Sequence, residues 1–313
     1  MHRRRLGKTD LEVSEIGFGA WQLGNDDQWG GMSTETAHQL VRTALDRGCN
    51  LFDTAPNYAK TRSESLLGES LTGHRQDVVL VSKFGHRPDG EPDYSVDHFW
   101  RSLHDSLTRL QTDYLDVVLI HSPPLHHLNG RDPIWAAMKE AQQQGKVRHY
   151  GASIDYACQV REVLDTTDAQ VLELLFNVLH QDVRLAFDRV RDNDVGVITK
   201  VPLDSGWLTG KYNARSVFEG VRARWSRADI ERRAELVEQL NWLTDGGRPL
   251  AEQALAYLLS YDEVSCVIPG LRSMAQLDTN FAADGRRLDP ADRQQLEAFW
   301  DGFTDEGRQL LPW

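Results

Sequence analysis

Short apolar runs alternate with longer segments of helical periodicity along most of the chain. The runs are almost continuously apolar, which is typical of strands buried on both faces, as in a parallel sheet covered by helices. Eight strands are predicted, at Ile16–Ala20, Asn50–Asp53, Val78–Lys83, Val117–His121, Arg148–Ser153, Val171–Phe176, Val195–Val201 and Cys266–Pro269. Amphipathic helices are predicted at Thr34–Arg47, Glu64–Leu71, Val96–Leu110, Pro133–Gln144, Ala157–Leu164, Arg184–Arg191, Leu250–Tyr261 and Ala291–Phe303.

This alternation predicts an α/β fold of the (β/α)8 TIM-barrel type, because eight β/α units in roughly 250 residues suit a closed barrel. A hairpin of Arg3–Leu6 and Glu12–Ser14 is expected before the barrel, with helical and loop segments after it. An open, doubly wound sheet is the alternative. The GxGxxG motif of that fold is missing, since Gly17–Ala20 leads into Trp21 and not into a helix. One domain over residues 1–313 is predicted.

Composition narrows the function classes. A net charge of -12 and a pI near 5.4 argue against general binding to nucleic acid or anionic lipid. Cys49, Cys158 and Cys266 form no CxxC pair, so neither a disulfide scaffold nor a zinc site is expected. Met1–Asp10 lacks the apolar stretch of a signal peptide, and no run reaches the roughly 20 apolar residues of a membrane span. A cytoplasmic protein is predicted.

Polar residues end three consecutive predicted strands. Asp53, Lys83 and His121 are separated by 30 and 38 residues, about one β/α unit each. They are therefore expected at the same end of neighbouring strands, at the mouth of a barrel. Tyr58 lies on the loop after Asp53 and is expected to reach the same place.

These four side chains suggest proton delivery to a carbonyl oxygen. Lys83 is flanked by apolar residues and needs an anionic partner, for which Asp53 is the natural candidate. The ammonium group of Lys83 is expected to lower the pKa of the Tyr58 phenol, making it a general acid near neutral pH. His121 is expected to hydrogen-bond a substrate oxygen. None of these groups supplies a hydride, so a bound reductant is required.

At these residues the chain resembles the aldo-keto reductases, and the match extends over nearly its whole length. The ordered series that carries the resemblance is Leu6-Gly7-Lys8, Val13-Ser14, Gly17-Phe18-Gly19, Phe52–Tyr58, Ser63–Gly68, Lys83, Leu110–Asp116, His121, Gly151-Ala152-Ser153, Gly206–Tyr212 and Ile268-Pro269-Gly270. The resemblance implies a (β/α)8 barrel with NADP(H) extended across its mouth. It also implies that Tyr58 is the proton donor, that Lys83 and Asp53 tune it, and that His121 orients the carbonyl.

The resemblance further implies a cofactor site made of Ser153, Glu173, Lys200, Pro202, Leu203, Gly270, Arg272, Gln276 and Asn280. Ser153 matches a residue that contacts the nicotinamide carboxamide, and the last four match the adenosine-phosphate site. Arg272 is suited to grip a 2′-phosphate, with backbone N–H groups near Ser273 adding to an anion site.

The sequence departs from the family pattern at the nicotinamide. Ile154 follows Ser153 where asparagine is common, Glu173 replaces a carboxamide-binding glutamine, and Lys200 replaces a stacking aromatic residue. We expect Glu173 and Lys200 either to pair with each other or to form a weak surface pair. Alternatively, Lys200 reaches the cofactor pyrophosphate.

Aromatic residues near the predicted mouth suggest a substrate pocket lined by Trp21, Trp29, Phe84 and Trp207. Trp29 and Phe84 are equally well explained as core residues. Such a pocket favours apolar or aromatic carbonyls and leaves small sugars possible. Specificity is expected from the insertion Asp204–Ser226 and from the C-terminal segment through Trp313.

Two other polar groups are predicted to be ordinary surface. His126 and His127 lie on a proline-containing loop with no carboxylate before Asp132, which disfavours a metal site. The stretch Arg222–Arg233 is predicted to be the solvated face of a helix, although Arg222 or Arg224 is also suited to meet an anionic ligand.

The leading prediction is an NADPH-dependent carbonyl reductase that also runs as an alcohol dehydrogenase on a small molecule. The main alternative is a cofactor-binding regulatory subunit that resembles the potassium-channel β-subunits. A third possibility is a barrel isomerase or aldolase that uses Lys83 as a Schiff-base amine. The oligomeric state stays open.

Overall fold

The computed structural model describes residues 1–312 and contains the predicted barrel; Trp313, at the end of the predicted specificity segment, lies outside the described residues. Parallel strands lie in the order β10-β9-β8-β7-β6-β5-β4-β3. Bridges from Ile16 to Val267 and from Gly19 to Gly270 join the first strand to the last. The strands are β3 (Phe18–Gly19), β4 (Leu51–Asp53), β5 (Val79–Phe84), β6 (Leu115–His121), β7 (Val147–Ile154), β8 (Val171–Leu175), β9 (Gly196–Lys200) and β10 (Val264–Val267).

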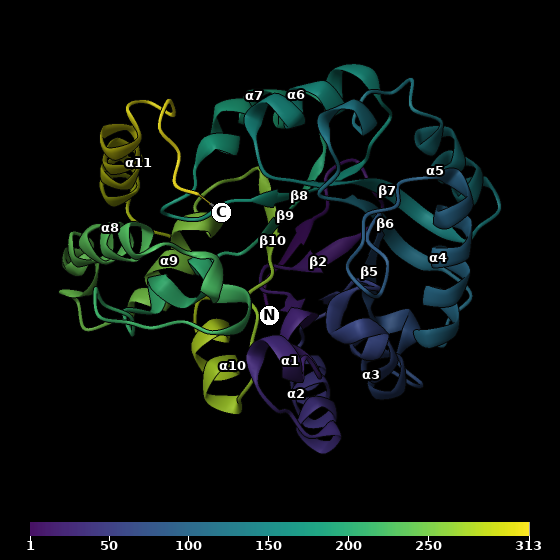
Figure 1. Ribbon diagram of the computed structural model, residues 1–313, viewed down its shortest axis with the longest axis horizontal. Coiled ribbons are helices and arrows are strands. Elements are labelled where there is room, and N and C mark those ends of the chain that lie inside the picture. Colours follow the sequence, from purple (N-terminus) through teal and green to yellow (C-terminus); the bar gives the residue numbers. More distant parts are fainter. Residues whose placement is uncertain (313) are drawn as a thin grey trace.

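Helices form a ring around these strands (Figure 1). The α-helices are α1 (Asp26–Trp29), α2 (Thr34–Asp46), α3 (Arg62–Ser70), α4 (Val96–Arg109), α5 (Pro133–Gln143), α6 (Ala157–Thr166), α7 (Phe187–Asp192), α8 (Arg227–Glu238), α9 (Leu250–Leu259), α10 (Met274–Phe281) and α11 (Pro290–Thr304). Short 3-10 helices are η1 (Ala20–Gln22), η2 (Tyr58–Thr61), η3 (Arg75–Asp77), η4 (Leu125–His127), η5 (Asp182–Ala186), η6 (Asp204–Thr209), η7 (Gly220–Arg224) and η8 (Asn241–Thr244).

The predicted hairpin is confirmed and covers the amino-terminal end of the barrel. Its strands β1 (Arg3–Arg5) and β2 (Glu12–Ser14) are antiparallel. Gly7, in the turn, has a φ of +54°, and a Cβ there would lie 2.0 Å from the backbone nitrogen of Gly196. Only glycine permits this close approach of hairpin and barrel.

The barrel interior is a continuous apolar core. It consists of Leu6, Leu11 and Val13 from the hairpin segment together with Leu51, Val79, Val81, Val117, Leu119, Val171, Ile198, Cys266 and Ile268. Side chains alternate between the two faces of a strand, so a residue two positions after an inward apolar residue also points inward. Asp53, Lys83, His121 and Glu173 each follow such a residue by two positions. The strand period therefore places them in the layer above the apolar core, at the carboxyl ends of the strands.

The insertion after β9 lies over the same end of the barrel. It contains η6 and η7, and η7 contacts α1 from the far side of the mouth. A Cβ on Gly220 would lie 2.7 Å from the backbone oxygen of Gln28, so the two segments meet closely. Together they form a strap across the mouth.

The prediction that Arg222–Arg233 is a solvated helix face is wrong in part. The helix α8 begins only at Arg227, and the side chain of Arg233 is fully buried. Its Nε lies 3.1 Å from Oδ2 of Asp204, whose side chain is also fully buried. The burial of this ion pair fixes α8 beneath the first turn of the insertion.

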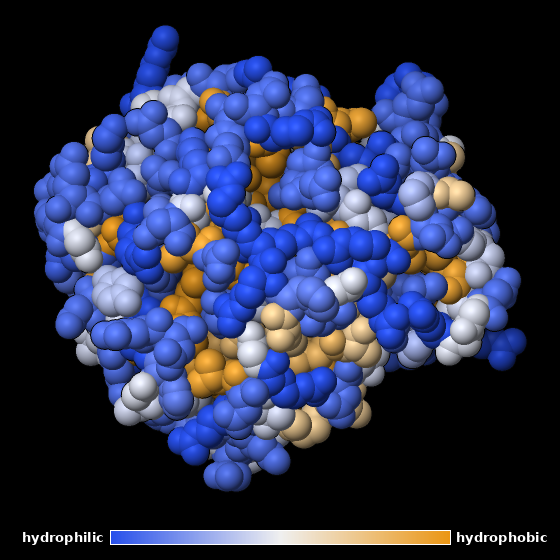
Figure 2. Space-filling model, turned by 180° about the vertical axis from the view of Figure 1, so that it is seen from behind, coloured by the Kyte–Doolittle hydropathy of each residue, from blue (hydrophilic) through white to orange (hydrophobic). Residues whose placement is uncertain are grey.

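Seen from the opposite side, the surface is mainly hydrophilic, with apolar residues visible in patches between polar side chains (Figure 2). Across residues 1–312, none of the helices combines the length and the apolar character needed to cross a lipid bilayer.

Replacing Arg233 with methionine is expected to lower the free energy of unfolding by about 3 kcal/mol, because Asp204 then remains buried without its cation. Chemical denaturation at neutral pH measures this change. Arg232→Met is the matched control, since the Arg232 side chain is 45% exposed and pairs with the exposed Glu235 of the same helix. Equal stability changes in the two variants would contradict the structural role given to Arg233.

Candidate active site

Lys83 is the centre of the polar layer above the barrel core. Its side chain is fully buried, and its Nζ lies 2.5 Å from Oδ2 of Asp53 and 3.3 Å from Oε2 of Glu173. The ammonium group also donates to the backbone oxygen of Thr54 at 3.1 Å. The structure thus brings Lys83 together with the predicted Asp53 and with a second carboxylate from the opposite part of the barrel.

Tyr58 reaches this layer from the loop after β4. The three residues that follow it, Ala59, Lys60 and Thr61, have φ values of 51°, 51° and 80°. Left-handed conformations at non-glycine residues cost about 1–3 kcal/mol each and are concentrated at functional sites. This turn directs the Tyr58 ring toward Lys83, whose Nζ lies 5.1 Å from the ring centroid. The ring also meets His121 edge-on, with 5.9 Å between centroids.

The expectation that Lys83 lowers the pKa of Tyr58 is wrong in its net direction. Burial raises the pKa of the phenol, and this effect outweighs the opposing influence of Lys83. Asp53 and Glu173 raise the Tyr58 pKa further. The sequence argument considered one cation, whereas the folded site places two carboxylates beside it. The phenol is therefore protonated at neutral pH.

The other titratable groups respond to the same burial. Burial opposes the charged form of Lys83, but Asp53 and Glu173 raise its pKa above the ordinary value, so the ammonium is charged. Burial and the charge of Glu173 raise the pKa of Asp53. For His121, burial followed by the charge of Lys83 lowers the pKa well below its usual range. His121 is therefore a neutral imidazole.

Glu173 and Lys200 do not form the predicted surface pair. The carboxyl of Glu173 is 2% exposed, and its Oε1 accepts a hydrogen bond of 2.9 Å from Ser153 Oγ. Lys200 Nζ instead lies 2.9 Å from Oδ1 of Asp155 and donates to Ser153 Oγ at 2.9 Å. Burial alone would raise the pKa of Glu173, but Lys83 and Lys200 lower it. Ser153 links the two halves of this buried network.

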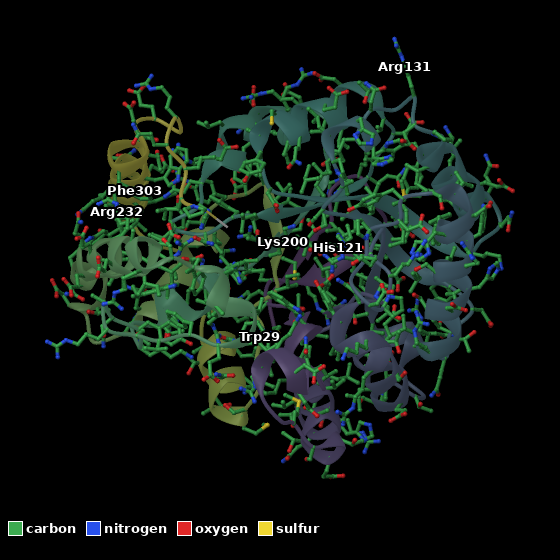
Figure 3. All side chains as sticks on the ribbon, in the orientation of Figure 1. Trp29, His121, Arg131, Lys200, Arg232 and Phe303 are labelled. Atoms are coloured by element: carbon green, nitrogen blue, oxygen red, sulfur yellow. The ribbon has the colours of Figure 1, made fainter. Side chains whose placement is uncertain are left out.

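One cavity of about 830 Å³ opens above these groups. Its volume is in the range of small-molecule and cofactor sites. Figure 3 shows Lys200 and His121 near the centre of the barrel mouth and Trp29 below them in this view. The sequence-predicted residues that line the cavity are Trp21, Trp29, Asp53, Tyr58, His121, Glu173, Lys200, Pro202, Leu203, Gly270, Arg272, Gln276 and Asn280.

Two of the predicted pocket aromatics, Phe84 and Trp207, do not line the cavity. Phe84 is buried against Phe99 of α4, because it alternates with Lys83 and so faces the helices. Trp207 is fully buried within the insertion. It packs against an aromatic group of Tyr212, Phe218 and Trp225. Ser153 also lies outside the lining, behind Glu173.

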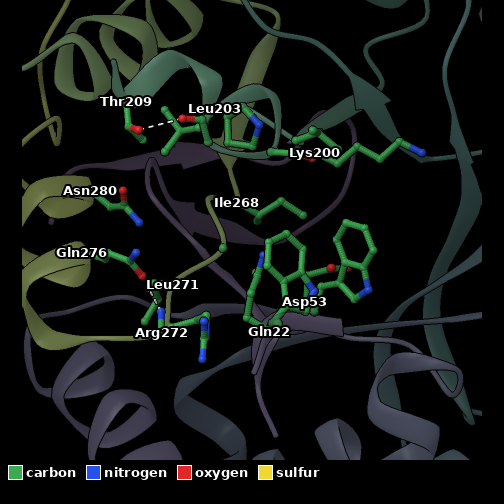
Figure 4. Close-up of a pocket in the computed structure, with 18 of the residues that line it drawn as sticks. Gln22, Asp53, Lys200, Leu203, Thr209, Ile268, Leu271, Arg272, Gln276 and Asn280 are labelled. Atoms are coloured by element: carbon green, nitrogen blue, oxygen red, sulfur yellow. Dashed lines mark hydrogen bonds between the residues drawn. The ribbon is translucent and has the colours of Figure 1, made fainter. Parts of the chain in front are cut away.

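The far end of the cavity has the polar groups predicted for an adenosine phosphate. Figure 4 shows Arg272, Gln276 and Asn280 on one side of the pocket and Lys200 and Asp53 on the other. Arg272 Nη2 donates to the Gly30 backbone oxygen at 2.9 Å, and Gln276 Oε1 accepts from the Arg272 backbone at 2.7 Å. Within residues 1–312, the buried Nδ2 of Asn280 and the buried Nε of Arg272 have no hydrogen-bond partner.

Other lining residues were absent from the predicted site. Gln22, Asn57 and Tyr212 line the cavity, and all three lie beside residues that the sequence did mark. Arg222 also lines it, with its guanidinium 4.3 Å from the Trp29 ring centroid. The sequence marked Arg222 or Arg224 as suited to an anionic ligand, but it did not distinguish between the two, because the contact depends on how the insertion crosses the mouth.

Comparison with known proteins shows which family has this fold and site. The sequence profile of the Aldo/keto reductase family matches residues 15–301. The chain belongs to the aldo/keto reductase family. Its members are oxidoreductases that use nicotinamide cofactors and act on small-molecule carbonyl substrates. The confirmed barrel and the family match agree with the resemblance seen in the sequence.

Among solved structures, the aldo-keto reductase AKR11C1 from Bacillus halodurans, in its holo form, is similar with a TM-score of 0.80 and 29% identity. The match covers 96% of each chain. L-galactose dehydrogenase from Arabidopsis thaliana is 30% identical over 292 residues, which are 90% of this chain and 87% of that protein.

Two further relatives bear on cofactor and function. The NADH-specific methylglyoxal reductase of Escherichia coli is 27% identical, covering 95% of this chain and 99% of that protein. A probable voltage-gated potassium channel subunit beta from Arabidopsis thaliana is 29% identical, covering 90% of this chain and 91% of that protein. The relatives therefore include a protein named as NADH-specific and a protein named as a channel subunit.

Replacing Lys83 with methionine is expected to destabilise the protein by about 3 kcal/mol at pH 8, because Asp53 and Glu173 lose their shared cation. Without it, both folded-state pKa values rise above the unfolded value of about 4. The loss of stability is largest at a pH above the raised pKa values of the folded state. It becomes smaller as the pH falls toward the pKa of the unfolded chain. Denaturation at pH 8 and pH 5 measures the difference, with the exposed Lys139→Met as control. A loss that does not depend on pH would contradict this account.

Proposed function

We propose that this protein is an NADP(H)-dependent aldo-keto reductase that interconverts an aldehyde or ketone and the corresponding alcohol by reversible hydride transfer. The observation that carries the proposal is that Tyr58 and Arg272 line one cavity. The proton donor lies at the end of the cavity where the nicotinamide ring would react, and the arginine lies at the end suited to the adenosine phosphate.

The far end of the cavity fits an adenosine phosphate. Buried donors without partners are rare in folded proteins and are commonly satisfied by a ligand or by water. Asn280 Nδ2 and Arg272 Nε are such donors within residues 1–312. We assign Arg272 to a 2′-phosphate and Asn280 and Gln276 to the adenine end. When bound, the dinucleotide supplies or accepts a hydride at its nicotinamide ring.

The protein's own residues handle the proton and the substrate oxygen. In reduction, the protonated Tyr58 phenol donates to the carbonyl oxygen, because the developing alkoxide is a stronger base than the phenolate. Lys83 stabilises the resulting phenolate through its positive charge. The neutral imidazole of His121 holds the substrate oxygen by a hydrogen bond. Trp21 and Trp29 form an apolar wall beside Tyr58, which favours apolar or aromatic carbonyls.

The Schiff-base alternative conflicts with the state of Lys83. A lysine that attacks a carbonyl must be an uncharged amine. Lys83 is held as an ammonium by two carboxylates, at 2.5 and 3.3 Å, and does not line the cavity. The regulatory-subunit alternative differs from the enzyme only in turnover, so kinetics separate the two.

We also place the protein in a reducing compartment such as the cytoplasm. Cys49, Cys158 and Cys266 are all free thiols in the described chain. Free cysteines suit a reducing environment.

Replacing Tyr58 with phenylalanine is expected to lower kcat by about 10²–10⁴-fold, because proton delivery to the carbonyl oxygen is lost. Dinucleotide affinity is expected to stay unchanged. NADPH oxidation with a panel of aldehydes, ketones and aldoses measures turnover, and Tyr156→Phe on the surface is the control. Wild-type protein that binds NADPH without turning over any substrate would favour the regulatory alternative.

Replacing Arg272 with glutamine is expected to weaken NADPH binding about tenfold or more, because a charge-assisted contact to the 2′-phosphate is lost. NADH lacks that phosphate, so its affinity is expected to change little. Titration of each cofactor measures this preference, with the exposed Arg131→Gln as control. Equal losses for both cofactors would refute the assignment of Arg272.

A further inference from the structure

A cluster of three carboxylates and two ammonium groups lies at the inner end of the cavity and beneath its lining. The carboxylates of Asp53, Asp155 and Glu173 meet the ammonium groups of Lys83 and Lys200, with nitrogen–oxygen distances of 2.5, 3.3 and 2.9 Å. Against the effect of burial, Lys83 and Lys200 lower the pKa of Glu173. Burial and the charge of Glu173 raise the pKa of Asp53. His121 and Tyr58, beside this cluster, are neutral at pH 7.

Glu173 is the carboxylate without an exclusive cation. Asp53 makes the shorter contact to Lys83, and Asp155 pairs with Lys200 at 2.9 Å. Glu173 makes a longer contact to Lys83 and accepts a hydrogen bond from the uncharged hydroxyl of Ser153. It nevertheless lines the same cavity as Tyr58 and His121. Its charge therefore faces the place where the reaction occurs.

A fixed charge at this place distinguishes the two redox forms of a nicotinamide. The oxidised ring carries a positive charge, and hydride transfer to it removes that charge. The charge of a buried carboxylate is poorly screened, so it attracts the oxidised ring and not the reduced one. A hydrogen bond to the carboxamide would favour both forms equally.

We propose that the carboxylate of Glu173 favours binding of the oxidised, cationic cofactor and so biases this site toward oxidising an alcohol. This inference rests on the proposed function. In that direction, the alcohol carbon loses a hydride, with its electron pair, to the nicotinamide. The phenol of Tyr58 first gives up its own proton to solvent, and the phenolate then takes the proton of the alcohol as the O–H bond breaks. The alcohol is oxidised to a carbonyl, the dinucleotide is reduced, and one proton is released.

The test is the affinity of each redox form, measured by calorimetric titration without substrate. Wild-type protein is expected to bind NADP⁺ more tightly than NADPH. Glu173→Gln keeps the size of the side chain and removes its charge. This variant is expected to weaken NADP⁺ binding about tenfold, which corresponds to about 1.4 kcal/mol, and to leave NADPH binding nearly unchanged.

Glu64→Gln is a matched control for altering a buried glutamate. Glu64 also pairs with a serine and a cation, Ser82 at 2.7 Å and Arg109 at 2.7 Å, but lies on α3 outside the cavity lining. The control is expected to preserve the ratio of the two affinities. Thermal unfolding of both variants verifies that they are folded.

Several outcomes would overturn the inference. If Glu173→Gln weakens the binding of NADP⁺ and NADPH equally, Glu173 acts only as a hydrogen-bond acceptor. If neither affinity changes, the charge of Glu173 does not act on the cofactor. Tighter binding of NADPH than of NADP⁺ by the wild type would overturn it even if the variant does not fold. Failure to bind either form is a different result, because it refutes the proposed function itself.

Discussion

The burial of the Lys83 ammonium is the constraint on which the site depends. A charge inside a barrel is costly unless anionic partners compensate for its lost hydration. Here the partners come from β4 and β8, as Asp53 and Glu173 at 2.5 and 3.3 Å. Because strands on different sides of the barrel contribute to one ion cluster, the cluster exists only when the sheet is closed. The catalytic side chains are therefore brought together only when the barrel closes.

This cluster also determines the protonation states of its neighbours. The charge of Lys83 adds to burial in keeping His121 neutral. The carboxylates of Asp53 and Glu173 oppose the lowering of the Tyr58 pKa by Lys83. Burial is the largest influence on the Tyr58 pKa and raises it more than Lys83 lowers it. The observed balance keeps the phenol protonated, so that its proton is available when charge develops on a substrate oxygen.

The cavity above the cluster is enclosed by loops as well as by strands. The barrel provides its floor, whereas the strap of α1 and the insertion provides its roof, with Arg222 placed over Trp29 at 4.3 Å. The insertion is fixed in turn by the buried pair of Asp204 and Arg233. Rigid strands thus hold the reacting groups while loops shape the space above them, a division common in barrel enzymes.

The sequence by itself determined the repeating β/α pattern, the hairpin and the polar strand ends. These are local properties: apolar periodicity sets the elements, and the period of two along a strand sends Asp53, Lys83 and His121 into one layer. The family resemblance of the sequence also marked residues at both ends of the cavity, among them Tyr58, Glu173 and Arg272.

Only the tertiary structure decided how charges from distant strands balance and which aromatic side chains face the cavity. Glu173 meets Lys83, not Lys200, because the closed barrel brings β8 across from β5, a contact that no spacing along the chain reveals. Trp207 is buried and Arg222 lines the cavity because the insertion folds back on itself. Pairing and burial are properties of three-dimensional proximity, and so a pKa, which depends on both, could not be read from the order of residues.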